Sequence, residues 1–167
     1  MKKIIRFIVA ASALLALAGC VRDMDPFEGG DGVRANINGQ KCVMLGDPGH
    51  KYASYSENPG GRFSAKFEMM HMLDRSEFHM EFKVSETSPL VTGVRYTVGS
   101  GENTAQLSYA FGNISGEAIP LAGWISFNKI GTDGATVEAR FELEGVSADG
   151  REYSVRHGFM RLYKNAE

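Results

Sequence analysis

The sequence predicts an all-β fold, either an antiparallel β-sandwich or a partly open barrel of about eight to nine strands. Apolar and polar residues alternate through most of the chain after Val33, and turns rich in glycine, aspartate and asparagine separate the alternating stretches. The chain has 20 glycines and no stretch with a clear 3.6-residue apolar period, which leaves little room for a long helix. Strands with one apolar and one polar face are typical of antiparallel sheets. We expect meander connections, because successive strands usually pair.

The first two strands are predicted at Val33–Ile37 and Gln40–Leu45, on either side of Asn38 and Gly39. Asn-Gly between two alternating stretches is the strongest short hairpin pattern, because both central residues of a type I′ turn need a positive φ. The domain is therefore expected to open with a tight hairpin.

Gly46–Gly61 is predicted to be a long loop, because Gly, Pro, Ser and Asn are frequent in it. Loops of this length without regular structure are usually functional or disordered. This one carries Tyr52 and Tyr55, and tyrosines in recognition loops provide a large contact area at low entropic cost. Both tyrosines are therefore candidate ligand-binding residues.

A second hairpin is predicted from Arg62–Leu73 and Glu77–Val84, which both alternate. Burying their apolar faces together requires paired residue numbers that sum to an odd value, because a slip of one residue turns a strand over. Two registers with short loops meet this condition: one pairs Leu73 with Ser76, and the other pairs Leu73 with Phe78. The second is preferred, because the first places like charges opposite each other.

Five further strands are predicted. They are Val91–Val98, Thr104–Phe111, Leu121–Ile130, Ala135–Val146 and Glu152–Tyr163. Trp124 is out of phase with its apolar neighbours, so it points to the opposite face from Ile125 and Phe127. An exposed tryptophan on a sheet suits sugar stacking or a protein contact, which makes Trp124 a third candidate ligand-binding residue. The alternative is a central strand buried on both faces.

Residues 1–19 are predicted to be a lipoprotein signal peptide. Three basic residues precede an apolar run of twelve, Phe7–Ala18, which is shorter than the about 20 residues that a spanning helix needs. The run closes on Leu-Ala-Gly followed by Cys20, an arrangement that resembles the lipobox of bacterial lipoproteins. The resemblance implies cleavage before Cys20 and lipid attachment to its sulfur.

Residues 20–32 are predicted to form a flexible acidic tether, with a single β domain at 33–167 after it. Loss of the three basic residues of the signal lowers 18 basic residues to 15, against 20 acidic ones. This balance argues against nucleic acid as a partner, because such binding needs a basic surface. It also leaves the lipid on Cys20 as the expected membrane anchor.

The sequence contains no catalytic constellation, so we expect neither enzymatic activity nor a cofactor. No cluster of His and Cys has the spacing of a metal site, and the register argument places His71 and His79 on opposite faces of their hairpin. Cys42 has no partner in the mature chain and is expected to be a small buried residue, a reactive thiol or an intermolecular link. An enzyme would need a cleft in which His71 or His157 meets a carboxylate from another strand.

After the lipobox and the acidic tether, the domain opens with Ala35–Gly39 and closes with the run Phe141–Phe159. These features resemble small outer-membrane lipoproteins of Bacteroides-type gut bacteria. The resemblance implies an all-β domain of unknown function on the outer membrane, and the acidic residues after Cys20 look like signals for export to the cell surface.

The function that we expect is therefore a membrane-anchored lipoprotein whose non-catalytic domain binds a glycan or a protein at the cell envelope. One alternative is a barrel calyx for an apolar small ligand, which the eight methionines would suit as an adaptable lining. Another is a purely structural envelope protein.

Overall fold

The computed structural model describes residues 32–44, 51–56, 60–111, 114–130 and 136–163, and all regular elements within them are β-strands. The strands are β1 (Gly32–Ile37), β2 (Gln40–Met44), β3 (Lys51–Ser56), β4 (Arg62–His71), β5 (Glu77–Ser85), β6 (Arg95–Val98), β7 (Thr104–Phe111), β8 (Ile114–Ser115), β9 (Ile119–Ile130), β10 (Thr136–Val146) and β11 (Glu152–Tyr163). The predicted all-β fold is confirmed. The signal peptide, Cys20 and the tether up to residue 31 lie outside the described residues.

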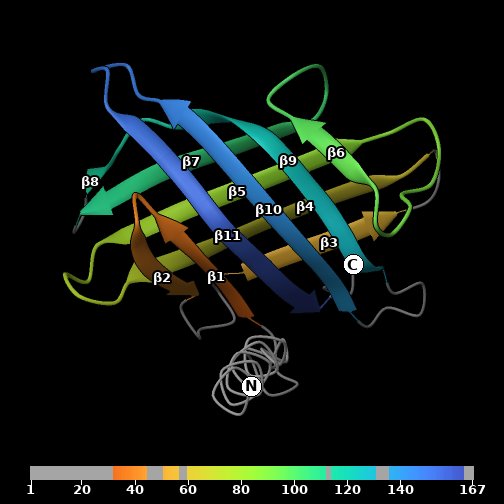
Figure 1. Cartoon of the computed structure of the whole chain (residues 1–167), viewed down its shortest axis with the longest axis horizontal. Coiled ribbons are helices and arrows are strands. Elements are labelled where there is room, and N and C mark those ends of the chain that lie inside the picture. The colour runs from red at the N-terminus through yellow and green to blue at the C-terminus, as the bar shows by residue number, and fades with distance from the viewer. Residues whose placement is uncertain (1–31, 45–50, 57–59, 112–113, 131–135, 164–167) are drawn as a thin grey trace, which may run out of the picture. The chain divides into compact units, whose positions relative to one another are not determined.

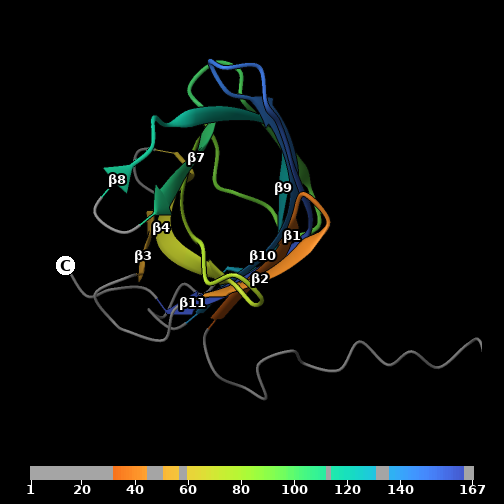
Figure 2. The ribbon, with the colours of Figure 1, turned by 90° about the vertical axis from the view of Figure 1, so that its left-hand side faces the viewer.

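Eight antiparallel strands close into a barrel in the order β9, β10, β11, β1, β2, β4, β5 and β7 (Figure 1). Two pairings between strands that are far apart in the sequence complete the ring that Figure 2 shows. β1 pairs with β11, and β7 pairs with β9. Of the two predicted architectures, the chain adopts the barrel, and the barrel is closed. Every pairing around it is antiparallel, as expected for a meander.

The remaining strands pair with strands of the barrel: β3 with β4, β6 with β9 and β8 with β7. β2 and β3 pair one after the other with the same strand, β4, and β6 and β7 do the same with β9. β2 and β3 therefore lie along the same edge of β4, and β6 and β7 lie along the same edge of β9. In each case the chain between the two strands interrupts the pairing. Between β6 and β7 the interruption is a tight corner, where Gly99 has a φ of 89° and a Cβ would meet the backbone of Ala122 at 2.6 Å.

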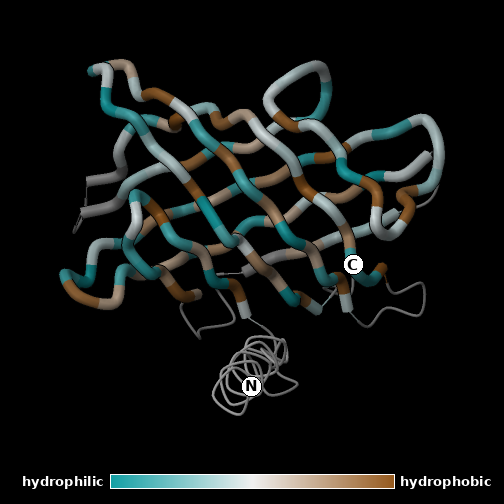
Figure 3. Tube along the Cα trace, in the orientation of Figure 1, coloured by the Kyte–Doolittle hydropathy of each residue, from teal (hydrophilic) through white to brown (hydrophobic). Residues whose placement is uncertain are grey.

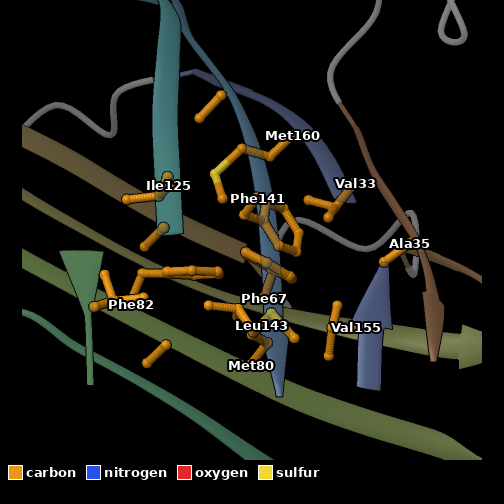
Figure 4. Close-up of a cluster of buried hydrophobic side chains, with 14 of the residues drawn as sticks. Val33, Ala35, Phe67, Met80, Phe82, Ile125, Phe141, Leu143, Val155 and Met160 are labelled. Carbon is orange, nitrogen blue, oxygen red and sulfur yellow. The ribbon is translucent and has the colours of Figure 1, made fainter. Parts of the chain in front are cut away.

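Side chains fill the inside of the barrel. Hydropathy changes from residue to residue along the strands (Figure 3), and the apolar residues of this alternation are the buried ones. Phe141 lies at the centre, with ring centroids 6.5 Å from Phe67 and 5.0 Å from Phe82, and Met80 and Met160 are fully buried with it (Figure 4). These contacts join opposite strands of the barrel into one core.

The first hairpin forms as predicted. Asn38 and Gly39 have φ angles of 51° and 80°, the signs that a type I′ turn requires. Ile37 pairs with Gln40 next to the turn, and the pairing continues to Arg34 and Val43.

The hairpin of β4 and β5 confirms the odd-sum rule but not either of the two predicted registers. Phe67 pairs with Met80, and both side chains point into the core. The predicted pairings of Leu73 with Ser76 and of Leu73 with Phe78 are therefore wrong, because the hairpin already closes at His71 and Ser76 and Leu73 lies within the turn.

The reason is a hydrogen-bonded turn centred on Asp74. Its carboxylate accepts hydrogen bonds from the backbone N–H and the hydroxyl of Ser76, at 2.9 and 2.6 Å, and lies 2.6 Å from Nδ1 of His71. The N–H of His71 donates to the carbonyl of Ser76, which sets the last pair of the hairpin. This local network decides the register, whereas the prediction weighed only the charges that face each other across the strands.

Gly46–Gly61 is not one long loop, because it contains strand β3. Ala53 and Tyr55 on this strand are buried, and Ser54 donates or accepts a 2.8 Å hydrogen bond with Ser64 on β4. The strand predicted at Val91–Val98 is shorter than expected, since only its last four residues pair with β9.

Candidate functional site

Trp124 lies on the outer face of β9, opposite in direction to the buried Ile125 and Phe127. The predicted orientation is therefore confirmed, and the indole is partly exposed. Arg95 on β6 stacks over it, with the guanidinium carbon 4.2 Å from the ring centroid. Such a cation–π contact holds a flexible side chain in one place.

A row of residues crosses the outer wall beside Trp124, with one residue from each of five neighbouring strands. Arg34 on β1 pairs with Phe159 on β11, Phe159 with Arg140 on β10, Arg140 with Ser126 on β9, and Ser126 with Arg95 on β6. We call these five residues the outer row. It places three guanidinium groups on alternate strands, and none of its members is a carboxylate.

Phe159 is in the outer row because of a β-bulge. His157 has a φ of 53°, and the pairings of β11 with both β1 and β10 shift by one residue there. Gly158 then faces inward, where a Cβ would meet the ring of Phe141 at 2.4 Å. The shift turns Phe159 outward, yet it is only 8% exposed, since the long side chains of Arg34 and Arg140 stand on either side of it.

The sequence did not predict this position of Phe159. The one available indication was Gly158 inside an otherwise alternating strand, because an isolated glycine in a strand often marks a bulge.

The two candidate tyrosines do not join Trp124 in one site. Tyr55 is on a strand rather than in a loop, is 7% exposed, and belongs to the barrel core. Tyr52 is on the same strand, where its backbone pairs with Lys66 of β4. β3 and β9 are not neighbours in the sheet.

A pocket of about 530 Å³ opens at one end of the barrel, where the turn after β10 meets the start of β9. Tyr109 and Tyr153 line it from the ends of β7 and β11, together with Ile119 and Val146. Pockets of this size are ordinary for small ligands. Phe78 supports the wall of the pocket, with its ring 5.3 Å from that of Tyr109 in an edge-to-face contact.

Two buried groups, His71 and Cys42, lie on neighbouring strands near the turn of β4 and β5. His71 is 2% exposed and contacts Asp74, while its neighbour across the sheet is Cys42 on β2. Burial raises the pKa of the Cys42 thiol to about 11, so at neutral pH it is a protonated thiol. His79 is on the outer face and lies 3.0 Å from Glu68, so the predicted separation of the two histidines is confirmed.

Among the described residues, no group of three or more His, Cys, Asp or Glu side chains is arranged to hold a metal ion. The same part of the chain contains no helix with the length and apolar character needed to cross a bilayer. Comparison with protein-family models, curated proteins and solved structures found no match for the chain.

Proposed function

We propose that the protein is a lipoprotein held on the outer membrane through Cys20, whose barrel is a non-catalytic binding module for a glycan or a protein. The observation that supports binding is the partly exposed Trp124, stacked with Arg95 beside a row of arginines on one outer wall. Aromatic and arginine side chains are the residues most enriched at binding hot spots. A wall of the barrel, rather than its packed interior, is thus the proposed recognition surface.

Anchoring is tested with Cys20→Ser. We expect the wild type to fractionate with outer membranes and to incorporate a labelled fatty acid, and the variant to do neither, because a diacylated cysteine is the only anchor proposed. Equal membrane recovery of both proteins would contradict the proposal.

Binding at the wall is tested with Trp124→Ala. On a panel of immobilised neutral and acidic polysaccharides and envelope protein extracts, the variant is expected to lose more than tenfold in affinity for whatever the wild type retains, since a hot-spot aromatic typically contributes about 2 kcal/mol or more. Tyr163→Ala is the control, because Tyr163 is an aromatic residue on β11 that is more exposed than Trp124 and lies outside the outer row. Unchanged affinity of Trp124→Ala would remove the wall from the proposal.

The absence of catalysis is part of the proposal and has support in the geometry. The only cysteine in the described residues is a buried thiol whose pKa is raised, which makes it a poor nucleophile. His71 contacts the carboxylate of its own turn, and His157 is exposed at the bulge of β11. Within the described residues, neither histidine forms a hydrogen bond with a carboxylate from another strand.

A second candidate is a calyx whose ligand enters the pocket at the barrel end, which Tyr109 and Tyr153 line. The size and mainly apolar lining of the pocket favour a small apolar ligand. Ala118→Trp would fill the pocket from its exposed rim, and we expect it to abolish the fluorescence of bound 1-anilinonaphthalene-8-sulfonate. Unchanged fluorescence would exclude this site.

A further inference from the structure

The outer row has the chemistry to recognise negative charge at regular intervals. Arg34, Arg140 and Arg95 alternate with Phe159 and Ser126 across β1, β11, β10, β9 and β6. Neighbouring strands are about 4.7–4.9 Å apart, so successive arginines are separated by about 9–10 Å. This regular spacing across the strands suits an extended chain with repeated anionic groups better than a single small anion.

The carboxylates of this wall stand in the adjacent rows, and two of them are already paired. Glu138 binds Arg161 at 2.9 Å, and Glu144 binds Arg156 at 3.0 Å. Glu142 is the cross-strand neighbour of Trp124 and lies two residues from Arg140 on the same outer face of β10. The outer row itself contains three arginines and no carboxylate, within a domain whose total charge is negative.

Trp124 positions one of these charges. A guanidinium that stacks flat on an indole keeps its in-plane N–H groups directed past the ring, where they can form two parallel hydrogen bonds to a carboxylate or a sulfate. Arg95 also covers one face of the ring, and a neutral sugar stacked on that face would have to displace it. The contact thus favours an anionic ligand over a neutral one.

From these observations we infer that the ligand of the outer wall is an acidic polysaccharide, lying across the strands with its carboxylate or sulfate groups on Arg34, Arg140 and Arg95. This inference rests on the proposed function, since it names the ligand class of the same wall. Trp124 then acts by holding Arg95 in place, and the mostly buried Phe159 separates Arg34 from Arg140 in the row.

The test measures binding of the full-length protein, purified in detergent, to dextran sulfate, polygalacturonate, unmodified dextran and a single-stranded oligonucleotide. We expect both acidic polysaccharides to bind, with an affinity that falls as salt rises, and dextran not to bind. Arg34→Gln, Arg95→Gln and Arg140→Gln combined should weaken binding by about tenfold or more, since each is one exposed ion pair.

The matched control removes the same number of charges from the opposite wall through Arg62→Gln, Lys66→Gln and Lys83→Gln on β4 and β5. An equal loss with this control would overturn the inference, because binding would follow total charge alone. Equal or tighter binding of the oligonucleotide would also overturn it, as would failure of both acidic polysaccharides to bind.

Two outcomes separate this inference from the proposed function. Binding of dextran that Trp124→Ala abolishes and the triple arginine variant retains would keep the binding wall and reject an acidic ligand. Loss of acidic polysaccharide binding in the arginine variant, with the melting temperature unchanged, supports both.

Discussion

The two walls of the barrel have the same kind of inner face and different outer faces. Inside the barrel, Phe67 on β4 and Phe82 on β5 contact Phe141 on β10, so both walls contribute aromatic side chains to the same core. Outside, the wall of β4, β5 and β7 pairs its charges locally: Glu68 lies 3.0 Å from His79, and Glu81 lies 3.2 Å from Lys83. The other wall has the outer row, in which arginines alternate with Phe159 and Ser126.

This difference separates the residues that form the fold from those available for recognition. Alternation along each strand assigns every second residue to the core, where only apolar character and volume matter. The other residues meet solvent, and their identity is not constrained by packing. The wall of β4, β5 and β7 presents acidic and basic side chains together, whereas the outer row presents three arginines and no carboxylate.

The largest effect is expected where the inner faces of both walls meet. Phe141→Ala should lower the free energy of unfolding by about 3–5 kcal/mol, because Phe141 is fully buried and the cavity would open between β4, β5 and β10. Urea denaturation followed by circular dichroism measures this. Phe141→Leu, which keeps most of the volume, should lose less, and a loss below 1 kcal/mol for Phe141→Ala would mean that the two walls are not joined there.

A smaller loss of stability is expected from substitution of Tyr55, and this variant tests whether Tyr55 is a core residue or a ligand contact. Tyr55→Ala should destabilise the domain by about 2–4 kcal/mol and leave polysaccharide binding unchanged in the folded protein, because the ring belongs to the core rather than to a recognition loop. Differential scanning calorimetry and the binding panel test both parts. Loss of binding without loss of stability would restore Tyr55 as a ligand contact.

The smallest effect is expected on stability at acid pH, where one turn from each wall can be compared. The hydroxyl and N–H of Ser76, and then His71, lower the pKa of Asp74 from 3.8 to about 2, while the hydroxyl of Ser147 lowers the pKa of Asp149 in the other wall. A carboxylate with a lowered pKa stabilises the fold above its unfolded pKa, and this contribution is lost as the pH falls through about 2.

Asp74→Asn should therefore reduce the difference in melting temperature between pH 5 and pH 2, and Asp149→Asn should reduce it less. Asp149 has an exposed turn around it, whereas Asp74 also holds the buried His71. An acid transition that is identical in wild type and Asp74→Asn would contradict this expectation.

Most strands could be predicted from the sequence, because alternation and turn residues are local properties. The Asn38-Gly39 turn and the limits of β9, β10 and β11 follow from them to within two residues. Closure of the barrel could not be predicted, since it depends on pairing of β7 with β9 and of β1 with β11. The register of β4 and β5 was missed because side-chain hydrogen bonds in the turn decide it.

The candidate site was only partly accessible from the sequence for the same reason. The phase of Trp124 within its strand predicts its outward direction correctly. Its contact with Arg95 joins strands β6 and β9, which are far apart in the sequence and pair only in the folded sheet. The outward turn of Phe159 needs the bulge at His157, and Tyr55 is buried because β3 pairs along β4.

The pairing of β1 with β11 also has a consequence for how the protein is made. Because Gly32 lies across from Arg161, the edge of β1 that β11 covers has no partner until β11 has been synthesised. Because the start of β1 lies beside the end of β11, a short linker could join these two ends, and new termini could be placed at the turn between β1 and β2. Neither change alters the strands of the barrel wall. Such a circular permutant would have the same barrel and would differ only in the order in which its strands are synthesised. The time for which the unpaired edge of β1 is exposed would therefore differ between the two proteins.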